Sequence, residues 1–332
     1  MRVGIVGAGW VTQYHLPAWL RLPGVEVVAI CDPDAAALAQ RADAFSIPQR
    51  FATLEDMLAH AELDALDIAS PRQLHAAHSR AGAARGLPLL CQKPLGVDLA
   101  EAEALVDEIA GRVPFMVHEN WRFRPYYRVL KTWLDAGLAG DITALRLDFR
   151  SSGMIAGADG QRPALVRQPF FRTERRLLVM EVLIHHLDAL RFLFGEFDIG
   201  SAVLGRSNAD IIGEDSAVLG LARRSDGVPL QVSGNLAVHG APPAPSDQLW
   251  IWGSKGTIHL DGATLRLTGP SPREAAFDPA SSYQGAYDGA IAHFVQHLTA
   301  GTPFETAATD NLETLRLVEG AYRISGFQPA AD

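Results

Sequence analysis

Short apolar runs alternate with amphipathic stretches over the first 120 residues, and this alternation restricts the possible fold more than any other feature of the sequence. The expected strands are 2–6, 25–31, 65–69, 87–91 and 114–117. The expected helices are 10–21, 34–45, 54–60, 73–85 and 99–109, whose spacing places Ala and Leu on one face. Strands that take turns with helices form βαβ units, and strands that are apolar almost throughout are buried on both faces. We therefore predict a parallel sheet covered by helices.

The pattern changes after about residue 140, where strand-like segments follow one another with turns between them. These segments are 141–152, 201–207, 216–223, 229–238, 249–252, 257–260 and 264–267. In the first of them Leu145, Leu147 and Phe149 alternate with polar residues, as in a sheet that is covered on one face. We predict an α+β domain with a large, mostly antiparallel open sheet, covered by helices at 181–194, 283–299 and 312–325. We expect residues 1–120 and 121–332 to be the two domains, and a homodimer or homotetramer to form through the uncovered face.

The charge balance and the cysteines restrict the partners and the compartment. Lys and Arg number 29 and Asp and Glu number 38, and this acidic balance repels nucleic acid and anionic lipid surfaces. No apolar run approaches the roughly 18 residues of a membrane span. Cys31 and Cys91 both lie in strand-like runs, which suits buried thiols in a reducing compartment. We expect a cytoplasmic protein that binds neither nucleic acid nor membrane.

A glycine-rich turn follows the first expected strand and precedes a helix. Gly7 would make the tight turn, Gly9 would let a pyrophosphate approach the backbone, and the N–H groups of Trp10 and Val11 would point at the anion. The third glycine of such a turn is replaced by Thr12. By itself the turn is also compatible with glycines that only let a strand enter a helix.

Asp32 ends the second expected strand, 20 residues beyond Thr12. A carboxylate there can accept hydrogen bonds from an adenosine ribose and would repel a 2′-phosphate. Because residues 33–36 contain no Lys or Arg, NAD is favoured over NADP. The alternative is that Asp32 caps the helix that starts near Asp34, or forms a turn before Pro33.

The strand that ends near residue 69 also reaches the edge of the sheet where ligands bind in such folds. Ser70 is therefore a candidate cofactor contact. His75 and His78 follow on a helix, and we expect them on a solvated face, with His75 as an exception that could reach the cofactor.

Lys93 follows the expected strand 87–91 and would lie at the same edge, where its amine could hydrogen-bond or deprotonate a substrate hydroxyl. The alternative is an ordinary surface lysine. In the second domain, Glu181, His185 and Asp188 stack along one side of an apolar helix at spacings of four and three. Glu181 could orient the imidazole of His185, and that imidazole could transfer a proton. One alternative is that Glu181 and His185 are a buried pair that only hydrogen-bond to each other. The other is a metal site, which is least favoured because the motif His-Glu-x-x-His is absent.

The segments Gly7–Trp10, Cys31–Pro33, Gln92–Pro94 and Glu181–Asp188, in this order and spacing, resemble the glucose-fructose oxidoreductase/inositol dehydrogenase (Gfo/Idh/MocA) family. The resemblance covers nearly the whole chain, including Trp252–Ile258. It implies a Rossmann domain, a second domain with a large open sheet, bound NAD(P), and hydride transfer at a carbinol carbon of a sugar or cyclitol.

The resemblance also assigns roles to single residues. It places Gln92 and Lys93 against the cofactor and makes Lys93, Glu181 and His185 the catalytic residues. Gln92 stands where the family usually has Glu, and Glu181 replaces Asp. Gln92 removes a negative charge beside Lys93, and Glu181 has a side chain that is one methylene longer than that of Asp.

The polar and aromatic run after the last strand of the first domain is where the family places residues that line cofactor and substrate. Trp121 and Arg122 would flank the nicotinamide, and His118, Glu119 and Asn120 would be available to sugar hydroxyls. The alternative is a hinge between domains whose aromatic residues only pack.

The resemblance, which includes residues 118–125 and 181–188, implies NAD-dependent oxidation of a cyclic aldose at its anomeric carbon to a lactone, with D-apiose as the first candidate. Lys93 and His185 would handle the hydroxyl proton, and no metal is expected. The alternatives are an inositol or other sugar or polyol dehydrogenase, and a non-catalytic NAD or sugar sensor.

Overall fold

The parallel sheet expected from the N-terminal alternation is present in the computed structural model, which describes residues 1–244 and 246–330. The chain forms two compact units. The first comprises Met1–Phe123 and Tyr283–Leu315, and the second comprises Arg124–Ser282 and the chain from Arg316 onward. The fold class predicted from the sequence is confirmed in both units.

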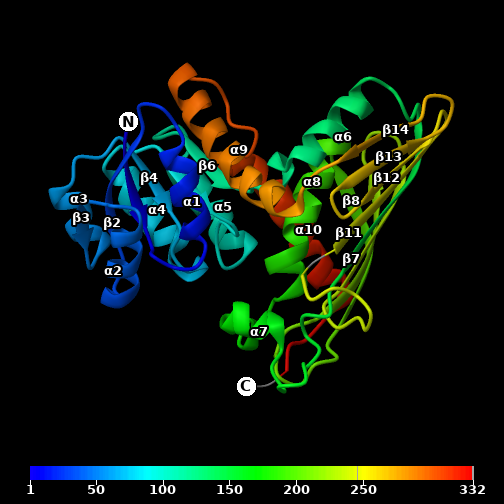
Figure 1. Ribbon diagram of the computed structural model, residues 1–332, viewed down its shortest axis with the longest axis horizontal. Helices are drawn as coiled ribbons and strands as arrows, with labels where there is room; N and C mark the ends of the chain where they lie inside the picture. The colour runs from blue at the N-terminus through cyan, green and yellow to red at the C-terminus, as the bar shows by residue number, and fades with distance from the viewer. Residues whose placement is uncertain (245, 331–332) are drawn as a thin grey trace. The chain divides into compact units, whose positions relative to one another are not determined.

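The first unit contains a six-stranded parallel sheet with the strand order β3-β2-β1-β4-β5-β6 (Figure 1). Its strands are β1 Arg2–Val6, β2 Glu26–Cys31, β3 Gln49–Phe51, β4 Ala65–Ile68, β5 Leu89–Gln92 and β6 Phe115–His118. Its helices are α1 Thr12–Leu20, α2 Ala35–Ala44, α3 Leu54–His60, α4 His75–Ala84 and α5 Leu99–Ile109, with short 3-10 turns η1 Arg72–Leu74 and η2 Trp121–Phe123. The sequence did not predict β3, because its three residues are too few and too polar to show a strand pattern.

The core of this unit lies between the sheet and its helices, as strands buried on both faces require. Val3, Ile5 and Leu90 of the sheet belong to one buried cluster with residues of α1 and α2. Cys31 and Cys91 are buried free thiols, and burial raises the pKa of Cys31 to about 12. Their placement agrees with the sequence prediction.

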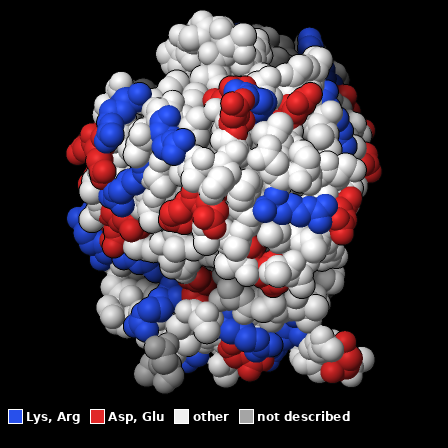
Figure 2. Space-filling view, turned by 90° about the vertical axis from the view of Figure 1, so that its left-hand side faces the viewer, with Lys and Arg blue, Asp and Glu red and all other residues white. Residues whose placement is uncertain are grey.

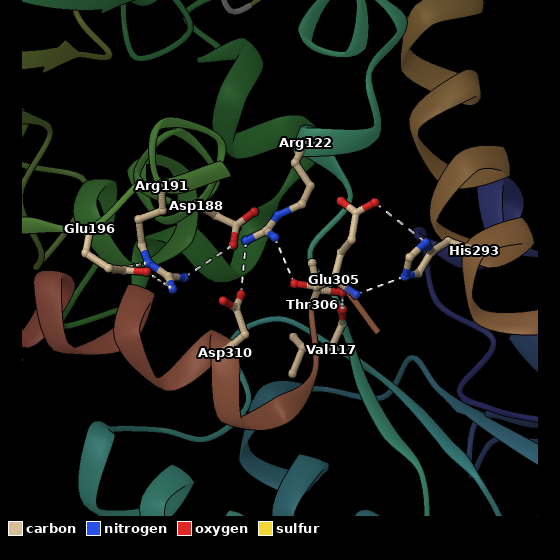
Figure 3. Close-up of polar contacts among 9 residues, drawn as sticks. All are labelled: Val117, Arg122, Asp188, Arg191, Glu196, His293, Glu305, Thr306 and Asp310. Atoms are coloured by element: carbon tan, nitrogen blue, oxygen red, sulfur yellow. Dashed lines mark hydrogen bonds and ion pairs between the residues drawn. The ribbon is translucent and has the colours of Figure 1, made fainter. Parts of the chain in front are cut away.

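A segment distant in sequence completes the first unit. In α9 (Pro279–Ala300), Tyr287, Ile291 and Phe294 belong to the same buried cluster as β1. Further along, the Thr306 hydroxyl donates to the Val117 carbonyl over 2.7 Å, and the Val117 N–H donates to the Thr306 carbonyl over 2.8 Å (Figure 3). From the sequence alone everything after residue 120 is expected in the second domain, because nothing local in an apolar helix indicates which distant sheet it will cover.

The second unit contains an eight-stranded sheet with the order β14-β13-β12-β11-β7-β10-β9-β8. Its strands are β7 Ile142–Arg150, β8 Phe197–Gly205, β9 Ser216–Arg223, β10 Pro229–Asn235, β11 Ser246–Gly253, β12 Thr257–Asp261, β13 Thr264–Thr268 and β14 Arg273–Ala276. Neighbouring strands are antiparallel except for the parallel pair β7 and β10. The sequence missed β14 and the start of β8.

The helical segments of this unit are α6 Pro125–Asp135, α7 Pro163–Arg167, η3 Pro169–Arg172, a π-helical turn η4 Leu178–Leu183, and α8 Ile184–Phe194; α10 Ala308–Ser325 enters it at Arg316. Figure 1 shows α6 and α8 on one face of the sheet. Val203, on the other face, is 70% exposed, and Val218 and Trp252 are also exposed. The homo-oligomer expected through this face stays a prediction.

The described surface carries mixed charge. On the face drawn in Figure 2, basic and acidic side chains are interspersed. Within residues 1–244 and 246–330, every helix is too short or too polar to cross a membrane.

Candidate functional site

The glycine turn after β1 combines a crowded residue with an open one. Gly7 has φ +105°, and a Cβ there would lie 2.7 Å from the Ala69 carbonyl oxygen, so only glycine suits this position. A Cβ on Gly9 would meet no atom within 4 Å. Thr12 closes the turn, because its hydroxyl donates to the Gly9 carbonyl over 2.7 Å. The turn therefore leaves open space at Gly9, and the predicted approach of the NAD pyrophosphate to the backbone there stays a prediction.

Asp32 braces this turn from the end of β2. Its Oδ2 accepts from the Ala8 N–H over 2.6 Å, and its Oδ1 accepts from the Asp34 N–H over 2.8 Å. The helix cap is Asp34, whose side chain accepts from the N–H groups at the start of α2. Each carboxylate oxygen of Asp32 can accept a further hydrogen bond, so the carboxylate remains suited to a ribose hydroxyl.

One basic residue at the glycine turn escaped the sequence analysis. The Arg41 guanidinium, on α2, donates to the Gly9 carbonyl over 3.2 Å. It lies nine positions after Asp32, and only the fold of α2 brings it to the turn.

Ser70, His75 and His78 are tied to one another at the end of β4. The Ser70 hydroxyl pairs with Nδ1 of His78 over 2.9 Å, and burial lowers the pKa of His78. The His75 ring is buried between two carbonyl oxygens, that of Ser70 at 2.8 Å from Nε2 and that of Pro94 at 2.7 Å from Nδ1. His75 is thus the exception to the solvated face that the sequence allowed, because α4 packs its first turn against the loop after β5.

Lys93 follows the last residue of β5 and is half-buried. Both of its chain neighbours are held by buried imidazoles. The Gln92 amide contacts His15 and His118, and the Pro94 carbonyl contacts His75. The fold thus presents Lys93 from a fixed backbone at the carboxyl edge of the sheet, where the sequence placed it.

His118, Glu119 and Asn120 follow at the end of β6, and all are buried. Within the described residues, the amide nitrogen of Asn120 has no hydrogen-bond partner. A buried unpaired donor is costly unless a ligand or water satisfies it. This supports the prediction that Asn120 serves a substrate hydroxyl.

Trp121 and Arg122, in η2, are buried as well. The Arg122 guanidinium donates to the Glu305 carbonyl over 2.8 Å and to the Asp310 carboxylate over 3.1 Å (Figure 3). These contacts tie η2 to the returning segment of the first unit. The predicted role of Trp121 and Arg122 at the nicotinamide stays a prediction.

In the second unit, Glu181 lies in the π-helical turn η4 and His185 in the first turn of α8, both half-buried. The sequence predicted one continuous α-helix from residue 181, with Glu181 and His185 stacked. The wider π turn changes that spacing, and such turns often occur at functional sites.

A buried carboxylate anchors the start of η4. Glu214 accepts from the Leu177 N–H over 3.2 Å, from the Val179 N–H over 3.0 Å and from the Tyr322 hydroxyl over 2.5 Å. Burial raises the pKa of Glu214, although these hydrogen bonds oppose the shift. The carboxylate satisfies N–H groups that the beginning of a helix leaves unpaired. Sequence reasoning missed it, because Glu214 lies in a distant loop.

Asp188, which the sequence predicted to stack with Glu181 and His185, has a different environment. Asp188 is buried 4.0 Å from the Arg191 guanidinium, which in turn pairs with Glu196 over 2.7 Å (Figure 3). Asp188 therefore belongs to an ion-pair network of α8.

A second buried cluster lies on the side of α8 that packs against the sheet. His186 Nε2 is 3.0 Å from Oδ1 of Asp247 on β11, and the Arg124 guanidinium is 3.7 Å from Oδ2. Burial opposes ionisation of Asp247, but the facing His186 and Arg124 hold the pKa of this carboxyl below its usual value. The sequence analysis paired His185 with Glu181 and did not foresee that the next residue, His186, meets a carboxylate 61 residues away.

The described residues include no group of three His, Cys, Asp or Glu side chains arranged to hold a metal ion.

Two family models match the chain. Residues 1–117 match the GFO_IDH_MocA model, described as an oxidoreductase family with an NAD-binding Rossmann fold. Residues 127–259 match the GFO/IDH/MocA C-terminal domain.

Several known proteins are similar over nearly the full chain. A D-apiose dehydrogenase from Paraburkholderia graminis is 32% identical, over 96% of this chain and 86% of the relative. A D-apiose dehydrogenase from Rhizobium rhizogenes is 30% identical, over 97% of this chain and 94% of the relative. A crystal structure of an oxidoreductase from Agrobacterium radiobacter, in complex with NAD+, L-tartaric acid and magnesium, superposes with a TM-score of 0.90 at 29% identity, over 98% of this chain and 96% of that chain.

Substituting the two glycines of the turn should have different effects, on NAD affinity for Gly9 and on thermal stability for Gly7. Gly9→Ala should leave the thermal stability unchanged and weaken NAD binding by about tenfold or more, a cost of about 1.4 kcal/mol, because the new methyl group occupies the space at the turn. Gly7→Ala should lower the melting temperature, since its Cβ meets the Ala69 carbonyl. Calorimetric titration with NAD and thermal melts check both. Unchanged NAD affinity in Gly9→Ala would show that the phosphates do not approach there.

Asp247→Asn should lower the free energy of unfolding at pH 7 by about 3 kcal/mol, because His186 and Arg124 lose a buried anion. The pKa of Asp247 is held below its unfolded value of about 3.9, so its stabilisation is present above that pH and is lost as the pH falls through the folded pKa. Urea unfolding from pH 7 to 3 should show the difference between wild type and variant shrinking below about pH 4. The control Asp226→Asn, which breaks an exposed pair with Arg223, should change stability little. A deficit in Asp247→Asn that is the same at every pH would contradict this account.

Proposed function

Because the chain belongs to the Gfo/Idh/MocA family of oxidoreductases and is an NAD-dependent enzyme that acts on CH–OH groups of sugars, we propose that its substrate is D-apiose. The reaction is oxidation of the cyclic aldose at its anomeric carbon, with the lactone as product. The observation that carries this proposal is the similarity to two D-apiose dehydrogenases, at 32% and 30% identity, which spans both units of the chain.

Loss of hydride from the anomeric carbon turns its hydroxyl into a carbonyl, so the hydroxyl proton must go to a base. When bound, NAD accepts the hydride. Lys93 is the base offered by the first unit, because it directly follows β5 at the ligand-binding edge and its chain neighbours Gln92 and Pro94 are both hydrogen-bonded to buried imidazoles. A neutral amine at that position accepts a proton from the hydroxyl, and an ammonium returns one in the reverse direction.

We propose His185 as the second proton-handling group and Glu181 as the carboxylate that orients its imidazole. Both side chains are half-buried on a helical segment whose start is anchored by Glu214. His118, Glu119 and Asn120 would bind the remaining sugar hydroxyls, and the buried unpaired amide of Asn120 supports this assignment. Gly7, Gly9, Trp10, Val11, Asp32, Ser70, Gln92, Trp121 and Arg122 would contact or frame the cofactor. The direct cofactor contact predicted for His75 is not part of the proposal, since both ring nitrogens face backbone carbonyls.

A panel of sugars tests the substrate. With NAD in excess, D-apiose should give the highest kcat/KM for NADH formation, above myo-inositol and the common pentoses and hexoses. A preference for myo-inositol would replace D-apiose by the cyclitol alternative. NAD binding without reduction by any sugar would favour the non-catalytic sensor and contradict the proposal.

Lys93→Met tests the proposed base. Turnover should fall by about 10²–10⁴, the range of general acid-base catalysis, while the NAD dissociation constant changes little, because the glycine turn and Asp32 are untouched. The control is Lys131→Met, which removes a lysine paired with Asp135 on α6 and should retain normal turnover. Stopped-flow NADH absorbance and NAD titration measure both quantities. Near-normal turnover of Lys93→Met would remove Lys93 from the reaction.

A further inference from the structure

A chain of buried polar side chains crosses the first unit behind Lys93. Oδ2 of Asp67 (β4) is 2.7 Å from Nδ1 of His15 (α1), Nε2 of His15 is 2.6 Å from the Gln92 amide nitrogen, and that nitrogen is 3.1 Å from Nδ1 of His118. Asp67 and His15 are fully buried, and Gln92 and His118 are nearly so. Placing these groups in an apolar core is costly unless every bond is made in the right direction.

One donor determines the direction of the whole chain. The Trp19 indole N–H can only donate, and it lies 2.7 Å from the same Oδ2 of Asp67. When the Asp67 carboxylate is ionised, that oxygen can only accept, and His15 then also donates to it from Nδ1. In a neutral imidazole the other nitrogen, Nε2, then carries no proton and needs a donor.

The residue that meets this nitrogen is Gln92. Its amide nitrogen carries two protons, one for Nε2 of His15 and one for Nδ1 of His118. An amide supplies both protons at any pH. A carboxylate in the same place would be an acceptor facing the unprotonated Nε2 of His15, and it would bind to that nitrogen only after a proton had been added.

The same bonds fix the backbone that carries Lys93. Gln92 pairs in register with His118 across β5 and β6, and its side chain also reaches α1 through His15. On the other side of Lys93, His75 holds the Pro94 carbonyl. A displacement of about 1 Å at a reacting group can cost about 10²-fold in rate, so the bonds of Gln92 bear directly on the position of the amine.

We propose that Asp67, His15 and Gln92 are positioning residues for Lys93, and that Asp67 makes an amide necessary at position 92 by fixing the tautomer of His15. This inference rests on the proposed role of Lys93. It assigns Asp67 and His15 a function in catalysis although neither lies at the ligand-binding edge.

Gln92→Glu tests this inference, because it changes one amide into a carboxyl of the same shape. The new carboxyl would face His15 from α1 and His118 from β6. Asp67 lies behind His15, and the ring of Tyr287 from α9 lies beside both imidazoles. Its chain neighbours are Cys91 and Lys93. At neutral pH the variant should lose about 10- to 100-fold in kcat. As the pH falls and the carboxyl gains its proton, the ratio of its kcat to that of the wild type should rise.

The matched control is Gln284→Glu. Gln284 also donates from its amide nitrogen, to the Tyr14 carbonyl and to Asp288, in the same unit but in α9. This variant should lose stability without any change in the pH dependence of its kcat ratio. A Gln92→Glu ratio that stays constant with pH, or full activity at neutral pH, would overturn the proposal.

Two measurements decide the proposal without enzyme turnover. In 15N-histidine NMR spectra of the wild-type protein, His15 should be the neutral tautomer protonated at Nδ1, and protonation at Nε2 would overturn the inference. The stability deficit of Gln92→Glu should also shrink as the pH falls. If no sugar is oxidised, these readouts still test the hydrogen-bond chain, while the proposed function fails separately on the sugar panel.

Discussion

The carboxyl ends of the parallel strands meet at one edge of the six-stranded sheet, and the candidate site of the first unit depends on that constraint. β1 ends before the glycine turn, β2 ends before Asp32, and β5 ends beside Lys93. Because all of these strands run in the same direction, groups that are far apart in sequence reach the same edge. Phosphate binding, ribose recognition and proton transfer can then be served by short loops on a rigid sheet.

Buried polar bonds hold those loops in place. Asp32 links the glycine turn to α2, His75 links the ends of β4 and β5, and Gln92 links β5 to α1 and β6. Each bond joins different elements, and those from Gln92 and from His75 to Pro94 lie where water has little access, so they constrain the backbone more strongly than a surface contact would. The second unit uses the same device, since Glu214 anchors the π turn that carries Glu181.

The strand ends and the helix that carry the candidate residues follow from the sequence, but the surroundings of these residues do not. The positions of Gly7, Asp32 and Lys93 follow from local periodicity and were found where expected. The helix with His185 was also expected, but its π turn depends on Glu214, more than thirty residues further along the chain. The return of residues 283–315 to the first unit was missed for a similar reason, because an apolar helix face does not specify which sheet it will cover.

The sequence by itself determined the two sheet types, the glycine turn and the strand end that carries Lys93, because these depend on apolar spacing and on the backbone freedom of glycine within a few residues. The tertiary structure alone decided which buried polar groups become partners. Asp67 and His15 are 52 residues apart, and Asp247 and His186 are 61 residues apart. Such partners are chosen by packing, since a buried donor must find an acceptor among whatever side chains the folded core brings to it.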